Sequence, residues 1–589
     1  MPSSNSYPLV QILHVTYTHW NQTEPTLRDL SLELGRGTLS VLVGPSGSGK
    51  STLCGLFNGV IPHLHGGKLE GDVLVDGVNT RSVEVKDLAR KVGILFQDPE
   101  TMFATLCVED EIAFGPECLC LPADLIRETV EQMLDLTQLG QHRLNQVWDL
   151  SGGQVQKLGL ASVLAMRPDL IILDEPTANL DPASTRAVHE LVLAMRDQGI
   201  TALLVTREMD ELLAQADQLI VVEGGHVLAA GSPREVIRAH GEYLVNSLGV
   251  WLPETVEIAV GLGLIATGLP DPPPITVEET VDLLERRGLL VDEIQAKAAT
   301  SREPSSGEVL IAARDLEFHY PDGTAALKGA SLDIRRGEML AIVGRNGAGK
   351  STLAKLMVGL LRPQAGELML FGKPARRWTV RSLANQVALV LQSPEHQVLT
   401  DRVIDEIGYS LVAKGVRDPA EVERLSHQML RLLGLEQEAN VHPFALSAGL
   451  KRRLGVATML VGDPKILLVD EPTYGQDKEM TRTLMELMEE IRSRGIAVVM
   501  ITHDMRLVQE YAERVVVMSD GRVLFDGPTS ALFDRGPLLA EANLRPTMLH
   551  ELLNAMRARG ARIRGDVRRT SDLLQAWASP RVGARNGRT

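Results

Sequence analysis

Two glycine-rich stretches decide the fold: GPSGSGKSTL at residues 44–53 and GRNGAGKSTL at residues 344–353. In each copy an apolar run with β-strand character precedes the glycine-rich stretch, and a helical pattern follows it. Glycines between a strand and a helix allow the backbone amides to turn inward around phosphate oxygens, where the helix dipole also favours negative charge. The sequence therefore predicts two phosphate-binding loops in one chain.

These loops belong to a longer internal repeat. LSGGQ at 150–154 corresponds to LSAGL at 446–450, and LDEPT at 173–177 corresponds to VDEPT at 469–473, in the same order in both copies. Strands alternate with helical patterns, which is typical of an α/β domain whose mostly parallel sheet is covered on both faces. We therefore expect two tandem α/β domains, at residues 7–240 and 309–538.

The segments outside the repeat differ from it in composition. Residues 241–308 contain DPPP and SREPSSGE and carry four basic against twelve acidic side chains, a net charge of −8. We expect this segment to be a linker with an amphipathic stretch. Residues 539–589 form a C-terminal extension with an arginine-rich tail. We interpret the tail as a disordered, solvated end, and contact with anionic lipid or RNA is the alternative.

The composition is that of a globular protein, because 44% of the 589 residues are hydrophobic, 23% are charged and the mean hydropathy is +0.01. A net charge of −16 and a pI near 5.4 argue against broad, charge-driven binding of nucleic acid. The sequence contains neither a secretory signal pattern nor an apolar run of the ~20 residues that span a bilayer. We expect a cytosolic chain whose four cysteines stay reduced.

The glycine-rich loops predict specific contacts with ATP or GTP and with Mg²⁺. The lysine of each loop would reach the β and γ phosphates, and the following serine would bind the metal. The predicted nucleotide ligands are Gly44, Gly47, Gly49, Lys50, Ser51 and Thr52 in the first copy, and Gly344, Gly347, Gly349, Lys350, Ser351 and Thr352 in the second.

An apolar strand ends in two adjacent acids in each copy, Asp174-Glu175 and Asp470-Glu471. The aspartate is placed to hold Mg²⁺ through water, and the glutamate is a candidate for polarising the attacking water. A glutamine upstream, Gln97 or Gln392, would contact the metal and this water. The predicted metal ligands are therefore Ser51, Gln97, Asp174, Ser351, Gln392 and Asp470.

The phosphate loop, the glutamine, LSGGQ, DEPT and a downstream histidine, in this order, resemble the ATP-binding cassette (ABC) ATPases over both copies. The resemblance implies that ATP and Mg²⁺ are bound, and that each parallel sheet is accompanied by an antiparallel β part and a helical subdomain. It implies further that two cassettes face head to tail, with each ATP between the loop of one and the LSGGQ signature of the other. The signature residues would be Ser151, Gly152, Gly153, Gln154, Ser447 and Gly449.

The same resemblance implies an aromatic side chain that stacks on adenine in each copy. Trp20 and Tyr320 stand at an offset of 300, the offset of the two phosphate loops, and are the candidates. The alternative for both is ordinary packing.

Head-to-tail pairing would collect every imperfect motif in one site. That site combines the first phosphate loop and Glu175 with Arg207, which cannot act as a neutral imidazole, and with LSAGL of the second copy. In LSAGL, Ala448 adds a methyl group where the backbone approaches phosphate, and Leu450 replaces an amide side chain. We expect this site to bind ATP and to hydrolyse it slowly.

The other site would match the family pattern throughout. It combines Gln392, Glu471 and His503 of the second copy with the intact LSGGQ of the first, and we expect it to carry most of the hydrolysis. The candidate catalytic residues of the chain are therefore Glu471, His503, Gln392 and Glu175. In the competing interpretation, Arg207 contacts the γ-phosphate as a charge donor and both glutamates work.

The segments that begin at Gln97 and Gln392, QDPETMFATLCVEDEIAFGPE and QSPEHQVLTDRVIDEIGYSL, resemble the energy-coupling factor (ECF) importers of vitamins and metals. This resemblance implies a fused pair of ECF ATPases at the cytoplasmic face of the membrane. The pair would dock under a membrane-embedded T component, which tilts a substrate-binding S component. The fused arrangement is most similar to the thiamine-precursor branch of that family.

Two other tandem families remain as alternatives. Ribosome-associated ABC-F proteins resemble one another in a long basic linker, whereas residues 241–308 are acidic. Tandem sugar-importer ATPases share the chemistry but lack a stretch similar to DEIAFG at residues 110–115. We therefore predict an importer subunit with no nucleic-acid partner, whose cassettes pair within one chain.

Overall fold

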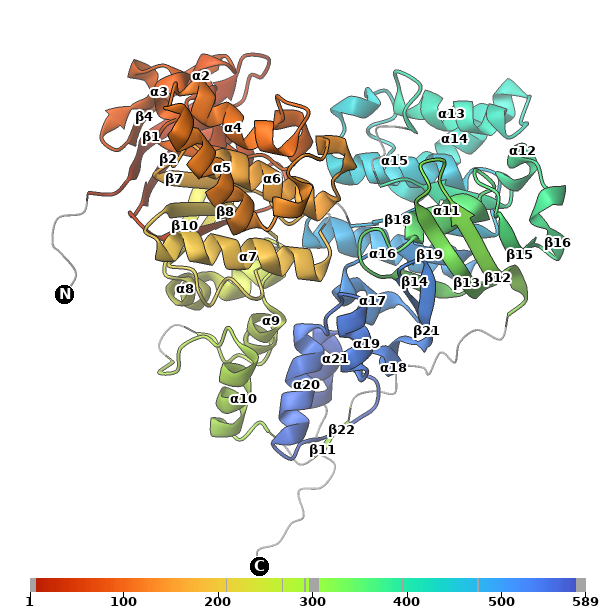
Figure 1. Cartoon of the computed structure of the whole chain (residues 1–589). Helices are drawn as coiled ribbons and strands as arrows, with labels where there is room; N and C mark the ends of the chain where they lie inside the picture. Colours follow the sequence, from red (N-terminus) through yellow and green to blue (C-terminus); the bar gives the residue numbers. More distant parts are fainter. Residues whose placement is uncertain are drawn as a thin grey trace, which may run out of the picture. The chain divides into compact units, whose positions relative to one another are not determined.

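The computed structural model describes residues 7–178, 180–207, 209–266, 269–290, 293–295, 307–392, 397–473 and 476–578. The chain divides into two units, Met1–Leu290 and Val291–Thr589. Figure 1 colours the first unit from red to yellow-green and the second from green to blue. Each of the two predicted α/β domains lies within one unit.

The core of the first unit is a six-stranded sheet in the order β10-β9-β3-β8-β7-β6. Strands β3, β7 and β8 are buried along their whole lengths, as expected of apolar strands that are covered on both faces. All neighbours are parallel except β10, which pairs antiparallel to β9 at the edge. The strands are β3 (Leu39–Val43), β6 (Val92–Leu95), β7 (Leu170–Asp174), β8 (Thr201–Val205), β9 (Gln218–Glu223) and β10 (His226–Gly231).

A four-stranded antiparallel sheet, in the order β2-β1-β4-β5, accompanies the core sheet. Its strands are β1 (Val10–His19), β2 (Leu27–Leu34), β4 (Gly67–Val75) and β5 (Val78–Asn79). Helix α1 (Lys50–Phe57) is packed between the sheets, because its Leu53 and Phe57 share one apolar cluster with Leu30 of β2 and Leu42 of β3. This packing fixes the helix that follows the first phosphate loop.

The remaining helices of the repeat cover the core sheet or form a separate helical part. That part has a core of its own, in which Ile112, Val130 and Leu158 meet, and it consists of α4 (Val108–Cys118), α5 (Ala123–Thr137) and α6 (Gly152–Leu164). The other helices are α2 (Val60–His63), α3 (Val85–Leu88), α7 (Pro182–Asp197) and α8 (Pro233–Asn246).

The second unit repeats this architecture strand for strand, with a core sheet in the order β17-β18-β19-β14-β20-β21 and an antiparallel sheet in the order β13-β12-β15-β16. The core strands are β14 (Met339–Val343), β17 (Val387–Val390), β18 (Ile466–Asp470), β19 (Ala497–Ile501), β20 (Arg514–Ser519) and β21 (Arg522–Pro528). The antiparallel strands are β12 (Val309–His319), β13 (Ala325–Arg335), β15 (Ala365–Leu370) and β16 (Lys373–Pro374).

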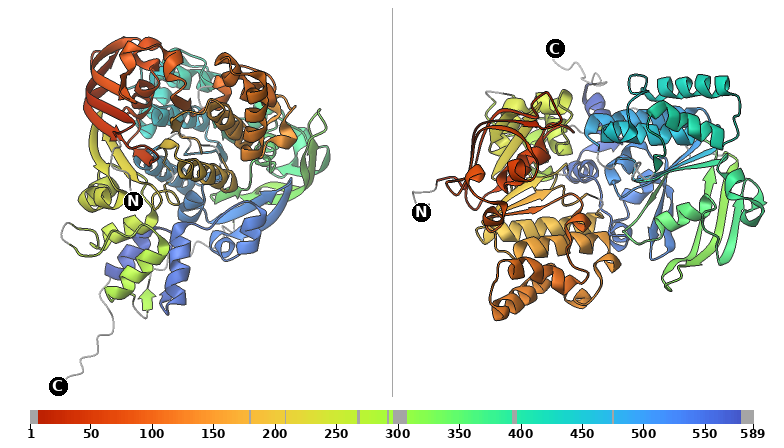
Figure 2. Two further views of the ribbon diagram at one scale, coloured as in Figure 1. Left: turned by 60° about the vertical axis from the view of Figure 1, so that its left-hand side comes forward. Right: turned by 90° about the horizontal axis from the view of Figure 1, so that it is seen from above.

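Most helices of the second unit correspond to those of the first, but among the described residues α17 has no helical counterpart in the first unit and α2 has none in the second. The helical part contains α13 (Val403–Ala413), α14 (Pro419–Leu433) and α15 (Ala448–Leu460). In the right-hand view of Figure 2 these turquoise helices lie clear of the green antiparallel strands of the same unit. The others are α11 (Lys350–Met357), α12 (Val380–Leu383), α16 (Lys478–Ser493), α17 (Met505–Tyr511), α18 (Thr529–Phe533) and α19 (Gly536–Glu541). The predicted tandem α/β architecture, with antiparallel and helical parts, is confirmed.

The segment that we expected to be a linker is largely folded onto the first unit. Helices α9 (Glu254–Gly261) and α10 (Val277–Arg286) follow α8. Val256 and Ile275 belong to the same apolar cluster as Val41 and Val43 of β3. The expectation was a linker with an amphipathic stretch; in the structure the apolar residues of this segment complete the core of the first unit. The part between the units is thus shorter than residues 241–308.

The arginine-rich extension also differs from the expectation of disorder. It forms α20 (Met548–Ala558), β22 (Arg562–Arg564) and α21 (Thr570–Ala578), and β22 pairs in parallel with β11 (Glu293–Gln295). Leu549, Leu552 and Met556 provide a buried face on α20. The guanidinium of Arg569 stacks on Tyr511 at the end of α17, 4.4 Å from the ring centre. The described part of the extension is therefore folded, and residues 579–589 lie outside the described part of the chain.

Among the described residues, no helix combines the length and apolar character needed to cross a bilayer. The four cysteines are all free thiols.

Candidate functional site

The predicted site residues of each unit gather at the carboxyl edge of its core sheet. Strands β3, β8, β7 and β6 are parallel neighbours, so the residues that follow them lie along one edge. In the first unit these residues are the phosphate loop after β3, Arg207 after β8, Asp174 and Glu175 at β7, and Gln97 after β6. The same strand order brings together the corresponding residues of the second unit.

The phosphate loops are closed on themselves by their lysines. Lys50 Nζ donates to the carbonyl oxygens of Gly44 and Pro45 at 2.9 and 2.8 Å, and Lys350 Nζ donates to those of Gly344 and Arg345 at 2.6 and 2.9 Å. The middle glycine of the first loop, Gly47, has φ +78°, and a β-carbon added there would meet no atom within 4 Å, so its surroundings are open. Each loop therefore has the curled backbone and the cation that phosphate binding requires.

A hydroxyl and a buried carboxylate stand beside each loop. Ser351 Oγ donates to Asp470 Oδ2 at 3.3 Å, and Ser51 is hydrogen-bonded to Asp174. Burial raises the pKa of Asp470 to about 6, and the adjacent charge of Glu471 adds to this effect. Burial likewise raises the pKa of Asp174. Hydroxyl and carboxylate oxygens are hard ligands that suit Mg²⁺, which keeps several waters in such sites, so the residues fit this ion.

The carboxylate of Glu471 contacts one polar side chain at each of its two oxygens in the second unit. Its Oε1 lies 2.8 Å from His503 Nδ1, and Thr502 Oγ1 donates to its Oε2 at 3.1 Å. Burial alone would raise the pKa of Glu471, but the charge and hydrogen bond of His503 keep it below the usual value. The backbone of Glu471 has φ 47°, a left-handed conformation that is strained for this residue. The side chain is thus an ionised acceptor beside an imidazole.

Glu175 of the first unit meets an arginine instead of an imidazole. Arg207 donates from Nε and Nη2 to Glu175 Oε1 at 3.0 and 2.8 Å, and Gln97 Nε2 lies 3.5 Å from Oε2. The backbone of Glu175 has the same left-handed conformation, with φ 50°. The main chain is therefore the same in the two units, while the carboxylate of the first is occupied by a permanent cation.

The signature residues begin a helix in each unit. Ser151 caps α6, and its backbone amide donates to Gln154 Oε1 at 2.8 Å, which completes a reciprocal capping box. Ser447 caps α15 by accepting from the amide of Leu450, but the leucine side chain cannot return a hydrogen bond. Gly449 lies close to α16, because a β-carbon there would lie 2.6 Å from Met480 Sδ and would displace that side chain. The second signature therefore keeps its backbone and loses one polar group.

The aromatic residue predicted for the first unit is displaced by one position. Tyr320 of the second unit forms a hydrogen bond with Thr352 Oγ1 at 3.0 Å and packs edge-on against Phe318. In the first unit the equivalent contacts are made by His19, which lies 3.5 Å from Thr52 Oγ1 and packs edge-on against Tyr17. Trp20 is 82% exposed. The structural counterpart of Tyr320 is therefore His19. The loop after β1 is one residue longer than the corresponding loop of the second unit, so the offset of 300 between the phosphate loops does not hold for these residues.

A buried glutamate supports the segment after each glutamine, and the sequence analysis did not single it out. Glu111 Oε2 accepts hydrogen bonds from Ala104 N and from both the amide and the hydroxyl of Thr105, at 2.8 to 3.0 Å. Glu406 Oε2 makes the same three contacts with Leu399 and Thr400. The repeated DEI triplet was the available signal.

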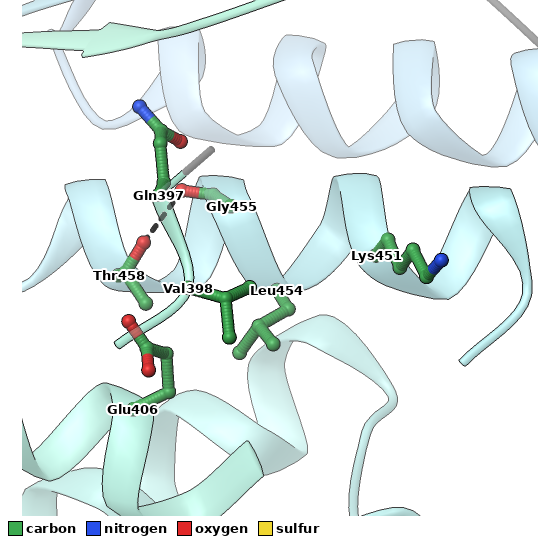
Figure 3. A pocket seen from close by; sticks show the side chains of 7 residues that line it. All are labelled: Gln397, Val398, Glu406, Lys451, Leu454, Gly455 and Thr458. Atoms are coloured by element: carbon green, nitrogen blue, oxygen red, sulfur yellow. Dashed lines mark hydrogen bonds between the residues drawn. The ribbon is translucent and has the colours of Figure 1, made fainter. Parts of the chain in front are cut away.

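In the second unit a small hollow adjoins this support. Figure 3 shows Gln397 and Val398 after the glutamine, Glu406 on α13, and Lys451, Leu454, Gly455 and Thr458 on α15 around it. Residues 393–396 and the loop residues Tyr474 and Gly475 lie outside the described part of the chain. Gln392 itself is partly buried at the start of this segment.

Comparison with protein families and with known proteins adds three findings. The family model described as ABC transporter matches residues 27–178 and 327–474, a segment in each unit. A protein from Methanosarcina acetivorans, provisionally described as an ABC transporter ATP-binding protein, is 36% identical over 570 residues, which cover 95% of this chain and 92% of that protein. A protein from Bacillus subtilis, provisionally described as the HMP/thiamine import ATP-binding protein YkoD, is 35% identical over 546 residues, which cover 92% of this chain and 96% of that protein.

Among solved structures, that of CbiO1 from Clostridium perfringens, described as part of the ABC transporter complex CbiONQ, is 32% identical. The match covers 42% of this chain and 99% of that chain, with a TM-score of 0.37.

Proposed function

The chain belongs to the ABC transporter ATP-binding proteins, and on this basis we propose that it is the motor subunit of an ECF-type importer for a vitamin or a metal ion. Family membership confirms the resemblance seen in the sequence and makes the chain an ATPase coupled to transport. The observation that carries the catalytic part of the proposal is the contact between Glu471 and His503, 2.8 Å long.

Hydrolysis is assigned mainly to the phosphate loop of the second unit. Glu471, ionised and aimed by His503 and Thr502, would accept a proton from the attacking water, while Lys350 would bind the β and γ phosphates. Gln392 would contact the same water. This site would be completed by the intact signature of the first unit, Ser151 to Gln154, through head-to-tail pairing of the units within one chain.

The site on the first unit would bind ATP and turn it over slowly. Arg207 donates twice to Oε1 of Glu175, so this oxygen is already occupied and is less available to the attacking water. The signature that would complete this site contains Ala448 and Leu450. Weakened general-base catalysis commonly costs ~10² to 10⁴ in rate, so the site would act as a nucleotide clamp.

Mg²⁺ would accompany the nucleotide in both sites. The residues that would hold it are Ser51, Gln97 and Asp174 in the first unit and Ser351, Gln392 and Asp470 in the second. The ion would supply positive charge to the transferring phosphoryl group. The protein's part is to present one hydroxyl and one buried carboxylate beside the loop, as the contact of Ser351 with Asp470 illustrates.

Exposed apolar side chains beside the two glutamine segments support docking to a membrane component. In the first unit these are Leu106 and Phe114, which are 64% and 42% exposed, and in the second they are Leu399 and Tyr409, which are 67% and 52% exposed. Phe114 and Tyr409 stand three residues after the buried glutamates Glu111 and Glu406, so both units present an aromatic ring on an equally supported segment. Such paired patches suit the cytoplasmic helices of a T component, which would place the chain at the cytoplasmic face of the membrane.

The cargo is proposed from the relatives. The Bacillus subtilis protein is described as an HMP/thiamine import protein, and it shares the fused arrangement over 96% of its length. This supports a thiamine precursor as the cargo that the S component would select.

A ribosome-associated ABC-F protein is the alternative function. The net negative charge of residues 241–308 argues against this function, because a segment that approaches RNA requires positive charge. The packing of Val256 and Ile275 into the first unit also leaves no long basic arm in this segment of the described chain.

Purification of the full chain from membranes in mild detergent tests the proposal that it is an importer subunit. We expect small, hydrophobic, multispan proteins to remain attached to the full chain. A matched variant, Phe114→Glu with Tyr409→Glu, should keep ATP binding and lose these partners. Co-purification of ribosomal proteins without any membrane protein would replace the proposal with the alternative.

A further inference from the structure

Arg452 is the largest fully buried side chain among the described residues, with 1% of its surface exposed. It lies in the first half of α15, five residues after the signature serine Ser447. A buried guanidinium is costly unless its donors and its charge are satisfied, so its contacts identify what it holds.

The contacts of Arg452 are with the main chain of two catalytic segments. Nη2 donates to the carbonyl oxygen of Glu471 at 2.6 Å, and Nη1 donates to the carbonyl oxygen of Leu391, the residue before Gln392. The amide of Glu471 donates to Ile501 O at 2.8 Å. Both polar backbone groups of Glu471 are therefore held, at a residue whose left-handed φ of 47° requires support.

The positive charge of Arg452 lies near the two acidic residues at the end of β18. Asp470 and Glu471 are two adjacent buried acids, and the positive charge of Arg452 lowers the pKa of Asp470 against the effect of burial. A planar guanidinium holds two carbonyl groups with donors in a fixed geometry while it supplies charge; glutamine lacks the charge, and lysine lacks the fixed planar geometry.

The corresponding position of the first unit carries Gln156, five residues after Ser151. Gln156 is also buried, with 5% exposed, but its Oε1 has no hydrogen-bond partner in the described structure. The arginine bridge is thus present in the unit whose glutamate meets a histidine, and a buried glutamine with an unpaired side-chain oxygen takes the place of the arginine in the unit whose glutamate meets an arginine.

We propose that Arg452 is a positioning residue for ATP hydrolysis, which holds Glu471 and the start of the glutamine segment in place from the signature helix α15. This inference rests on the proposed role of Glu471. Helix α15 begins at the signature of the second unit, and the start of this helix would contact the nucleotide bound to the first unit. Because Arg452 joins α15 to Glu471, the placement of Glu471 depends on the position of α15.

The test compares Arg452→Gln, Arg452→Lys and the control Arg453→Gln in the full-length chain. Arg453 is the next residue of the same helix, is partly buried and has no described bond to a catalytic segment. We expect R452Q to lower kcat by ~10- to 100-fold, because a small misplacement of a catalytic group has that effect. The KM for ATP should stay within about threefold, since Lys350 and its loop are untouched. R452K should give an intermediate kcat, and R453Q should behave as wild type.

The comparison of kcat with KM separates positioning from mere packing. A packing defect would lower turnover and ATP binding together, whereas a misplaced Glu471 lowers kcat at an almost unchanged KM. Thermal unfolding and ATP binding measured on the same samples correct for the folded fraction. If R452Q does not fold, R452K carries the test through its lowered kcat at unchanged KM.

Two results would overturn the inference: a wild-type kcat in a folded Arg452 variant, or a fall in kcat that only parallels the fall in ATP binding. Glu471→Gln is measured beside them. If it abolishes turnover while Arg452 variants are normal, only the inference fails. If it too is neutral, the assignment of Glu471 as the base fails.

Discussion

Arg207 donates two hydrogen bonds to a single oxygen of Glu175, at the position where His503 contacts Glu471 in the second unit. The two glutamates share the same strand end and the same left-handed backbone, with φ 50° and 47°. The units therefore differ in the partner of the carboxylate rather than in its placement. A permanent cation and a titratable imidazole give the same carboxylate different chemistry.

Exchange of these partners tests their influence on rate. We expect His503→Arg to reduce kcat by ~10² to 10³, because Glu471 would then be bound as Glu175 is, with little change in ATP affinity. Turnover is measured by phosphate release from the full chain. Arg207→His is the matched change in the first unit, and it should raise total turnover by no more than about twofold, since Ala448 and Leu450 remain in its signature. A normal kcat for His503→Arg would contradict the role given to the imidazole.

The binding of magnesium nucleotide should depend on pH through Asp470. Its pKa of about 6 lies above that of an unfolded aspartate, so below this pH the carboxyl is protonated and must lose its proton to hold the metal. Affinity at the second site should therefore fall about tenfold per unit as pH drops below 6. Fluorescent ATP titrations with and without Mg²⁺ measure this effect. Asp470→Asn should remove the metal dependence at every pH.

The raised pKa of Asp470 also determines how the stability of the metal-free protein changes with pH. Between pH 4 and 6 the folded chain holds a proton on Asp470 that the unfolded chain has released, so this group's contribution to stability is lost as pH rises toward 6. Asp470→Asn should flatten this part of the stability profile.

The displaced aromatic residue predicts which side chain of the first unit senses adenine. His19→Ala should weaken ATP binding at the first site by about tenfold, because loss of a base-stacking ring costs ~1 to 3 kcal/mol. Trp20→Ala should change the affinity by less than about twofold, since Trp20 is exposed and lies one residue beyond the contact with Thr52. Tyr320→Ala is the comparison in the second unit. A larger loss for Trp20 than for His19 would restore the assignment made from the sequence.

The folded extension predicts a stabilising arginine. Arg569→Ala should lower the free energy of unfolding of the second unit by ~0.5 to 2 kcal/mol, through loss of the stacking on Tyr511. Denaturant unfolding of the full chain measures it. Arg562 is exposed on β22, and Arg562→Ala is the control, which should stay within about 0.5 kcal/mol of wild type. Equal effects of both changes would contradict the docking of the extension on α17.

The sequence predicted those parts of the site that are defined by local pattern. The glycine loops, the Asp-Glu pairs and the two signatures each lie within a few residues, so their spacing determines their structure. The equivalence of His19 and Tyr320 was missed because a single inserted residue shifts a strand end, and only the contacts with Thr52 and Thr352 reveal it.

Other features depend on contacts between distant residues. Arg452 meets carbonyl oxygens 61 and 19 residues away in sequence, and nothing near it in the sequence distinguishes it from its partly buried neighbour Arg453. The segment that contains α9 and α10 was expected to be a linker with an amphipathic stretch, because the core to which its apolar residues contribute includes Val41 and Val43 of β3, more than 200 residues earlier. Tertiary packing decides such cases.

We propose that one glutamate, Glu471, carries most of the hydrolysis. The ATPase rates of Glu471→Gln and Glu175→Gln, measured side by side in the full-length chain, test this proposal. We predict that Glu471→Gln abolishes most turnover and that Glu175→Gln retains most of it, with ATP binding intact in both. Equal losses of turnover in the two variants would contradict the account.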